Sequence, residues 1–199
     1  AALASPDTQM ATFTVTEKGY CRAPDGDLDI ALAHSGSIYG LLAEGLARRR
    51  EAGHAGLTLL SCDNLAHNGK QLERLLLAFL DGRDPPLADW VRTACSFPSS
   101  MVDRIVPATT EADLSSAETA LGQRDEGHVG TEAFSQWVIE DRFAGPRPWL
   151  EDHGVQLVSD VALYETAKLR MLNGAHSLMA YCGLARGHAA QPRSRPAAR

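Results

Sequence analysis

The stretch LTLLSCDN, residues 57–64, is a nearly continuous apolar run that ends in Cys62, Asp63 and Asn64. Strands buried on both faces of a parallel sheet have such runs, whereas half-exposed strands alternate apolar and polar residues. We therefore interpret residues 57–64 as an inner strand with polar groups at its carboxyl end. In open α/β sheets, ligands bind outside that end of the strands.

Helical patterns flank this strand on both sides. Before it, Ser35 or Ser37 is a suitable N-cap for a helix that Gly53 follows. After it, apolar residues recur twice at helical spacing. Helices are expected over residues 35–53, 69–82 and 86–95.

Further strands complete the predicted sheet. Residues 11–17 alternate like a strand, 101–107 and 134–141 are short strand-like runs, and the pattern is helical from Asp160 onward. This order predicts an α/β fold with a mostly parallel sheet, followed by a helical segment. Polar residues end three of the strands: Thr16 and Glu17, Asp63 and Asn64, and Glu140 and Asp141.

The composition argues against a nucleic-acid or membrane partner. The 199 residues are 44% apolar and carry a formal net charge of −6, which allows a sizeable core. The dense basic cluster at 47–51 closes a helix and is interpreted as a solvated helix end. The longest apolar runs fall well short of the roughly 18 residues that a membrane span needs.

The four cysteines and seven histidines are scattered along the chain, without CxxC or zinc-ligand spacing. No metal site is therefore expected. Free thiols are typical of a reducing compartment, so we expect a cytoplasmic protein.

A lysine interrupts the apolar face of the helix after Asp160. At i, i+3 and i+4 spacings one apolar stripe forms, made of Tyr164, Met171, Leu172, Ala175, Leu178, Met179 and Cys182. Lys168 projects from the middle of this stripe. Either it extends its ammonium past the stripe to water, or the stripe buries it and lowers its pKa for a chemical role. Asn173 and His176 follow within two turns, although His176 alone is more often a packing residue.

The spacing of Lys168 and Asn173 raises a geometric problem. On an ideal α-helix they lie about 140° apart, so both cannot face one small substrate. Either the helix is distorted near Gly174, which would permit it, or the substrate lies in a cleft that wraps around the helix.

Other polar candidates also have structural interpretations. Asp63 and Asn64 could cap the next helix. Asp103 and Arg104 could form a structural ion pair. Residue by residue, these alternatives stay open.

Taken together, the motifs resemble the long-chain polyol dehydrogenases of the mannitol dehydrogenase and fructuronate reductase (D-mannonate oxidoreductase) family. The resemblance runs from about Thr14 to His188, and KLRMLNGAHS fits the Lys-x4-Asn-x2-His pattern that carries catalysis in this family. The other carriers are TVTEKGY (14–20), LLSCDNLAHNG (59–69), FPSSMVDRIVPATT (97–110), FSQWVIEDRFAGPRP (134–148) and LVSDVALYETA (157–167).

The resemblance implies metal-free hydride transfer between a secondary alcohol and a ketone, with NAD as cofactor and NADP as an open alternative. It makes Lys168 the general acid/base, and burial would keep such a lysine neutral. Asn64 and Asn173 would hold the reacting oxygen, a function worth roughly 2.7–4 kcal/mol per donor in well-studied enzymes. His176 would bind and orient the substrate.

The same resemblance assigns supporting and cofactor residues. Glu165 would tune the proton path, and Asp103 would support the site. Thr16, Glu17 and Asp63 are the expected cofactor contacts.

The resemblance also implies two domains. Residues 1–158 would be the C-terminal part of a Rossmann-like NAD-binding domain, and 159–199 the start of an all-α domain with a disordered Pro/Arg/Ala tail. The family's Gly-rich phosphate-binding turn has no counterpart in this sequence. The chain is therefore expected to be a fragment of a longer enzyme.

The substrate is expected to be a small sugar acid or polyol. MLNGAHS and FSQWVIED look closer to the fructuronate reductase branch, which interconverts D-mannonate and D-fructuronate, and mannitol 2-dehydrogenase activity is the alternative. A hexuronate carboxylate needs a cation, for which Arg104, Arg142 and Arg170 are candidates. An inactive truncated product and a non-catalytic binding module are further alternatives, and the resemblance implies a monomer.

Overall fold

Two units make up the chain, Ala1–Val161 and Ala162–Arg199, in a computed structural model that describes residues 2–187. The boundary lies three residues after the one expected from sequence. The expectation of a disordered tail concerns residues from His188 onward, which lie outside the described residues.

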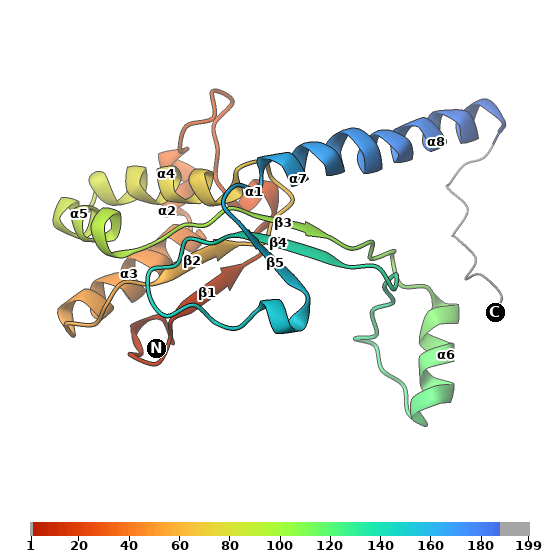
Figure 1. The fold of residues 1–199 in the computed structure, drawn as a ribbon, viewed down its shortest axis with the longest axis horizontal. Helices are drawn as coiled ribbons and strands as arrows, with labels where there is room; N and C mark the ends of the chain where they lie inside the picture. Colours follow the sequence, from red (N-terminus) through yellow and green to blue (C-terminus); the bar gives the residue numbers. More distant parts are fainter. Residues whose placement is uncertain (1, 188–199) are drawn as a thin grey trace. The chain divides into compact units, whose positions relative to one another are not determined.

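The inner strand anticipated at residues 57–64 is present as β2 (Thr58–Ser61), and all four of its residues are buried. It pairs in parallel with β1 (Met10–Phe13), in a register that matches Phe13 with Ser61. The crossover between them carries α1 (Thr16–Gly19), α2 (Ile30–His34) and α3 (Ile38–Glu51), which makes a βαβ unit (Figure 1). The strand expected over 11–17 ends at Phe13, because the chain turns into α1.

The ends of α3 follow the signals in the sequence. Of the two predicted caps, Ser37 is the one used: its hydroxyl accepts the backbone N–H of Tyr39 at 3.3 Å. Ser35 instead ends α2. Gly53, just past the helix, has φ +71°, the left-handed conformation that favours glycine after a helix.

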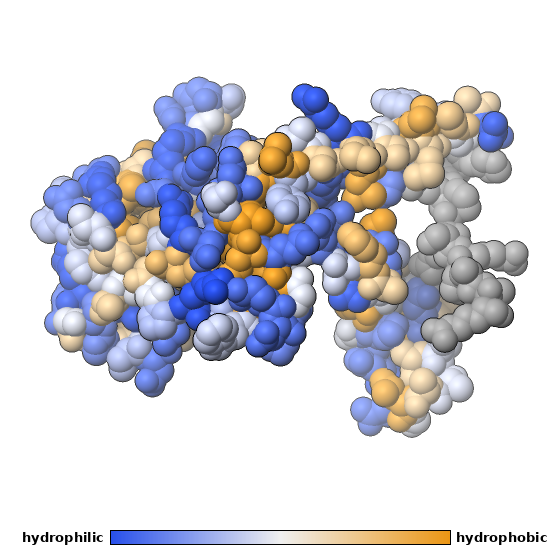
Figure 2. Space-filling model, in the orientation of Figure 1, coloured by the Kyte–Doolittle hydropathy of each residue, from blue (hydrophilic) through white to orange (hydrophobic). Residues whose placement is uncertain are grey.

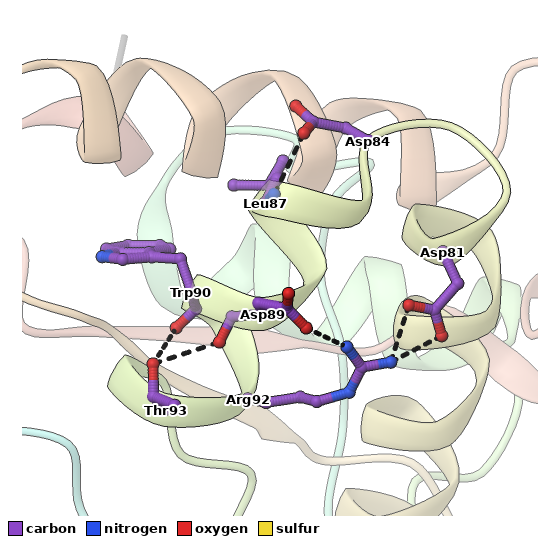
Figure 3. Close-up of polar contacts among 7 residues, drawn as sticks. All are labelled: Asp81, Asp84, Leu87, Asp89, Trp90, Arg92 and Thr93. Atoms are coloured by element: carbon purple, nitrogen blue, oxygen red, sulfur yellow. Dashed lines mark hydrogen bonds and ion pairs between the residues drawn. The ribbon is translucent and has the colours of Figure 1, made fainter.

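Helices α4 (Asn68–Asp81) and α5 (Pro85–Ala94) meet at a corner held by charged side chains (Figure 3). Asp84 caps α5 by accepting the N–H of Leu87 at 3.0 Å. From α5, Arg92 donates to both carboxylate oxygens of Asp81 at 2.6 Å. One guanidinium nitrogen makes both of these bonds, and the other terminal nitrogen donates to Asp89 at 2.8 Å, so Arg92 links α5 to the end of α4.

Three strands follow, β3 (Ser100–Asp103), β4 (Gln136–Glu140) and β5 (Val155–Val158). β4 and β5 are parallel, but β3 and β4 are antiparallel. The prediction of a mostly parallel sheet thus missed one reversal, because residues 104–135 lead out from β3 and return beside it. Both β5 and α6 (Glu111–Leu121), which lies in that excursion, were also missed.

The segment that leads into β3 is joined to β2 by an isolated bridge and a side-chain hydrogen bond. Thr58 and Ser96 form a parallel bridge, and the Ser100 hydroxyl donates to the carbonyl of Ser61 at 2.6 Å. The main core lies under β1 and β2, where α3, α4 and α5 contribute buried leucines. Each fully buried leucine is worth about 1.5–3 kcal/mol relative to exposure. Short 3-10 turns are formed by Ala2–Ala4 and Glu151–His153.

The second unit is a single helical rod made of α7 (Ala162–Ala167), a π-helix (Lys168–Asn173) and α8 (Gly174–Ala185). Apolar side chains line the surface of α8 (Figure 2). Among the described residues, no helix is both long and apolar enough to cross a bilayer.

Candidate functional site

Asp63, directly after β2, ties the ends of β1 and β2 together. Its Oδ1 accepts the backbone N–H of Thr16 at 2.8 Å, and its Oδ2 accepts that of Val15 at 3.1 Å. Only 6% of Asp63 is exposed. The carboxylate therefore points into the protein. The capping role considered for it at α4 is wrong, because His67 is the N-cap residue of α4 and no side chain caps this helix.

Two hydroxyl groups complete the surroundings of this carboxylate. The Tyr20 hydroxyl donates to Asp63 at 3.1 Å and lies 2.5 Å from the Ser61 hydroxyl. Ser61 also lies 3.4 Å from the Asp63 carboxylate and accepts the Asp63 backbone N–H at 3.2 Å. Burial, the largest cause, and the nearby Asp63 carboxylate raise the pKa of Tyr20 well above its usual range, so it acts only as a neutral hydroxyl.

Asn68, fully buried at the start of α4, holds the other side of this loop. Its amide nitrogen donates to the carbonyls of Asp63 and Ser100 at 2.9 and 2.8 Å. Its oxygen accepts the N–H groups of Gly69 and Ser100. All four hydrogen-bonding positions of the amide are thus used, and β2, α4 and β3 are fixed to one another.

The predicted cofactor residues Thr16 and Glu17 and the predicted oxygen-binding Asn64 sit at the surface around this network. All three are exposed. Thr16 has φ +62°, an uncommon conformation for a branched residue that the surrounding structure must enforce. The hydrogen bond from its N–H to Asp63 is one such constraint. The structure therefore brings Thr16, Asp63 and Asn64 together at the carboxyl ends of β1 and β2.

Asp103 ends β3, where it pairs with Gln136 across the antiparallel ladder. The neighbouring Arg104 donates to the carbonyl of Glu132 at 3.1 and 3.2 Å. At the end of β4, the Glu140 carboxylate is buried and accepts the N–H of Ser99 at 2.9 Å. The Glu140 side chain therefore makes a structural contact inside the protein, although the sequence placed Glu140 among the polar residues at the strand ends, where ligands bind.

The π-helix resolves the geometric problem of Lys168 and Asn173. The N–H of Gly174 donates to the carbonyl of Leu169, five residues earlier. This wider register has more residues per turn than an α-helix, which brings Lys168 and Asn173 closer together around the helix axis, toward the same side of the helix. The distorted-helix alternative is the one that the structure contains. Gly174 is not what permits it, since its φ and ψ of −62° and −43° are ordinary helical values.

The burial expected for Lys168 is not provided by its own helix. Met171, Leu178 and Met179 of the apolar stripe are 74%, 63% and 52% exposed, and Lys168 is half-buried. The expectation that this stripe encloses the lysine was wrong for the described residues, because one helix cannot cover its own apolar face. Asn173 and His176 are also half-buried, whereas Glu165 is buried.

Three residues of the network escaped the sequence analysis: Tyr20, Ser61 and Asn68. Ser61 had a weak signal, since it is a polar residue at the end of a fully buried strand. Tyr20 is 43 residues from Asp63 in the sequence, and only the βαβ crossover brings them together. No local pattern could have paired them.

Parallel strands joined through helices, with polar residues at their carboxyl ends, define a Rossmann-like α/β domain. The chain belongs to the mannitol dehydrogenase family: residues 1–152 match its Rossmann domain. The resemblance inferred from the motifs is thereby confirmed.

Named relatives make the likeness more specific. The chain is 42% identical to D-mannonate oxidoreductase of Escherichia coli K12 and 39% identical to mannitol 2-dehydrogenase of Neosartorya fischeri, over 94% and 92% of its length. It covers 41% and 40% of those proteins. The chain also resembles a solved structure, the ternary complex of Pseudomonas fluorescens mannitol 2-dehydrogenase with NAD and D-mannitol, at a TM-score of 0.81 and 38% identity. The alignment covers 94% of this chain and 40% of the dehydrogenase chain.

Proposed function

We propose that the full-length protein carrying this chain is an NAD-dependent oxidoreductase that interconverts D-mannonate and D-fructuronate. The observation that carries the proposal is the alignment of Lys168 and Asn173 on one side of a π-helix. Such helices occur frequently at functional sites. The 42% identity to D-mannonate oxidoreductase supports this substrate pair.

In this proposal each residue has a distinct task. When bound, the nicotinamide accepts or supplies the hydride. Lys168 removes the hydroxyl proton of the alcohol during oxidation and returns it during reduction. Asn64 and Asn173 donate hydrogen bonds to the reacting oxygen. No metal takes part.

The remaining predicted residues have supporting tasks. His176 orients the substrate, and Glu165, one turn before Lys168, conducts the proton. Asp103 supports the site. Half-burial of Lys168, Asn173 and His176 leaves each of them accessible to a ligand.

The strand ends fit part of the cofactor. Exposed Thr16 and Glu17 follow β1 at the edge where dinucleotides bind in open α/β sheets, and we assign the contacts to them. The sequence has no glycine-rich turn for the pyrophosphate.

Mannitol 2-dehydrogenase activity is the second candidate, favoured by the 0.81 TM-score to the mannitol complex. The carboxylate of a hexuronate distinguishes the two. Of the three candidate arginines, Arg104 and Arg142 donate to the carbonyls of Glu132 and Phe97, while Arg170 is an exposed residue of the π-helix. Arg170 follows Lys168 by two residues and therefore lies on a different side of the helix, so we assign the carboxylate to none of the three.

The test is NADH oxidation by the full-length protein with D-fructuronate and D-fructose. Higher kcat/KM for fructuronate supports the proposal, whereas a preference for fructose moves the assignment to mannitol 2-dehydrogenase. Turnover of neither substrate, in a protein that unfolds cooperatively, contradicts both.

Lys168→Ala tests the mechanism directly. Loss of the acid/base should lower kcat by about 10²–10⁴-fold with little change in KM. Lys70→Ala is the matched control, since Lys70 is exposed on α4, and it should retain full activity. Equal activity of the two variants would refute the role of Lys168.

A further inference from the structure

The buried Asp63 carboxylate is held by neutral hydrogen-bond donors. Its donors are two backbone N–H groups, from Val15 and Thr16, and the hydroxyl of Tyr20, which in turn accepts the hydroxyl of Ser61. A buried carboxylate is costly unless its lone pairs are satisfied, and here three neutral donors contact it. An asparagine could not do the same, because its NH₂ group would face a backbone N–H.

The segment that Asp63 holds is itself strained. Thr16 has φ +62° and lies where the chain leaves β1 and enters α1. Such a conformation is unfavourable for a residue other than glycine and persists only when its surroundings enforce it. The 2.8 Å bond from the Thr16 N–H to Asp63 Oδ1 is the contact in place to do so.

The opposite side of Asp63 is fixed as well. Its carbonyl accepts the amide of Asn68 at 2.9 Å, so the residue cannot move without breaking bonds to β1, β2 and α4. Asn64, which is exposed and follows Asp63 in the chain, is therefore attached to a residue that hydrogen bonds hold in place.

We propose that Asp63 is a positioning residue and not a cofactor contact. Its carboxylate fixes the position of the Val15–Thr16 turn relative to Asn64. This inference rests on the proposed function, in which Thr16 contacts the cofactor and Asn64 binds the reacting oxygen. Asp63 acts through these two neighbours and touches neither cofactor nor substrate.

Asp63→Asn in the full-length protein is the test, with Asp29→Asn as its matched control. Asp29 caps α2 through one backbone contact, to Leu32 at 2.9 Å, which asparagine can also make. Asp63→Asn should raise the dissociation constant for NADH and lower kcat, reducing kcat/KM by about 10- to 100-fold. Asp29→Asn should change neither.

Hydrogen exchange measured by mass spectrometry supplies a readout independent of turnover. In Asp63→Asn, exchange should accelerate in residues 13–20 and 62–69 and stay unchanged in α5. Local acceleration together with weaker NADH binding supports the inference. Uniform acceleration, or wild-type NADH binding and kcat, overturns it.

Two outcomes separate this inference from the proposed function. If the wild-type protein turns over neither sugar, the proposed function fails, while local exchange and NADH binding still decide the role of Asp63. If Asp63→Asn does not fold, Tyr20→Phe removes one donor to the carboxylate and gives the same readouts. A 2- to 5-fold loss of NADH affinity with local acceleration then supports the role of Asp63, and unchanged values overturn it.

Discussion

The ends of β1 and β2 and the π-helix both present candidate functional residues, but they hold them by different means. At the strand ends, a buried network around Asp63 and Asn68 fixes the backbone from several sides. In the π-helix, a change of hydrogen-bond register in one helix aligns Lys168 with Asn173. The first arrangement depends on contacts between distant segments, and the second depends on local backbone geometry.

This difference predicts different tolerance to added atoms. Interiors are packed as densely as organic crystals, so an added methyl group must displace neighbours at the strand ends. An exposed helix surface has room for it. The two regions should therefore respond with opposite signs to the same glycine-to-alanine change.

Gly69→Ala should give the largest effect. A Cβ at Gly69 would lie 2.5 Å from the carbonyl carbon and the carbonyl oxygen of Pro98. It would also lie 2.6 Å from the carbonyl oxygen of Phe97, and all three are backbone atoms. Relief of this clash requires α4 to move away from the segment before β3, which should cost about 2–3 kcal/mol of unfolding free energy. Urea unfolding of the 199-residue chain measures it.

Gly40→Ala provides the matched control in the same unit. Gly40 lies within α3, and an added Cβ meets nothing within 4 Å, so this variant should be as stable as the wild type or slightly more stable. Equal stabilities of Gly69→Ala and Gly40→Ala would show that the strand ends are not tightly packed.

High pH should weaken the sheet unit through its buried tyrosines. Burial, the largest cause in each case, raises the pKa of Tyr20 and Tyr39 well above the usual value of about 10. In the unfolded chain both ionise near pH 10, so the unfolded state binds fewer protons than the native state above that pH. The stability present below pH 10 is therefore lost as the pH rises.

Tyr20→Phe isolates the contribution of the network to this decline. Between pH 8 and pH 11, the variant should lose about 1 kcal/mol less unfolding free energy than the wild type loses. Tyr181→Phe, at a position 71% exposed on α8, should leave the decline unchanged. The same decline in all three proteins would place its cause outside the network.

The comparison also explains what could be predicted from the sequence. β2 and the Ser37 cap depend on residues adjacent in the chain, and both were predicted. The contacts of Asp63 with Thr16 and Tyr20 span more than 40 residues, so their partners could not be inferred from any local pattern. The reversal at β4 follows from an excursion whose own helix, α6, was not recognised.

The π-helix was half-predicted. The five-residue spacing of Lys168 and Asn173 conflicted with an α-helix and indicated a distortion, but the reason offered for it was Gly174. The backbone at Gly174 is ordinary helix. The distortion therefore belongs to the hydrogen-bond register of residues 168–173 and not to glycine flexibility.

Gly174→Ala tests that conclusion and should give the smallest effect. An added Cβ would lie 3.8 Å from the Leu169 carbonyl oxygen, an ordinary contact. Because alanine favours helix over glycine by up to about 1 kcal/mol, the variant should gain about 0.5–1 kcal/mol in helix stability. Thermal unfolding followed by far-ultraviolet circular dichroism measures the gain. If the π-helix instead needs the freedom of glycine, Gly174→Ala will lose stability as Gly69→Ala does, and the contrast between the two regions will disappear.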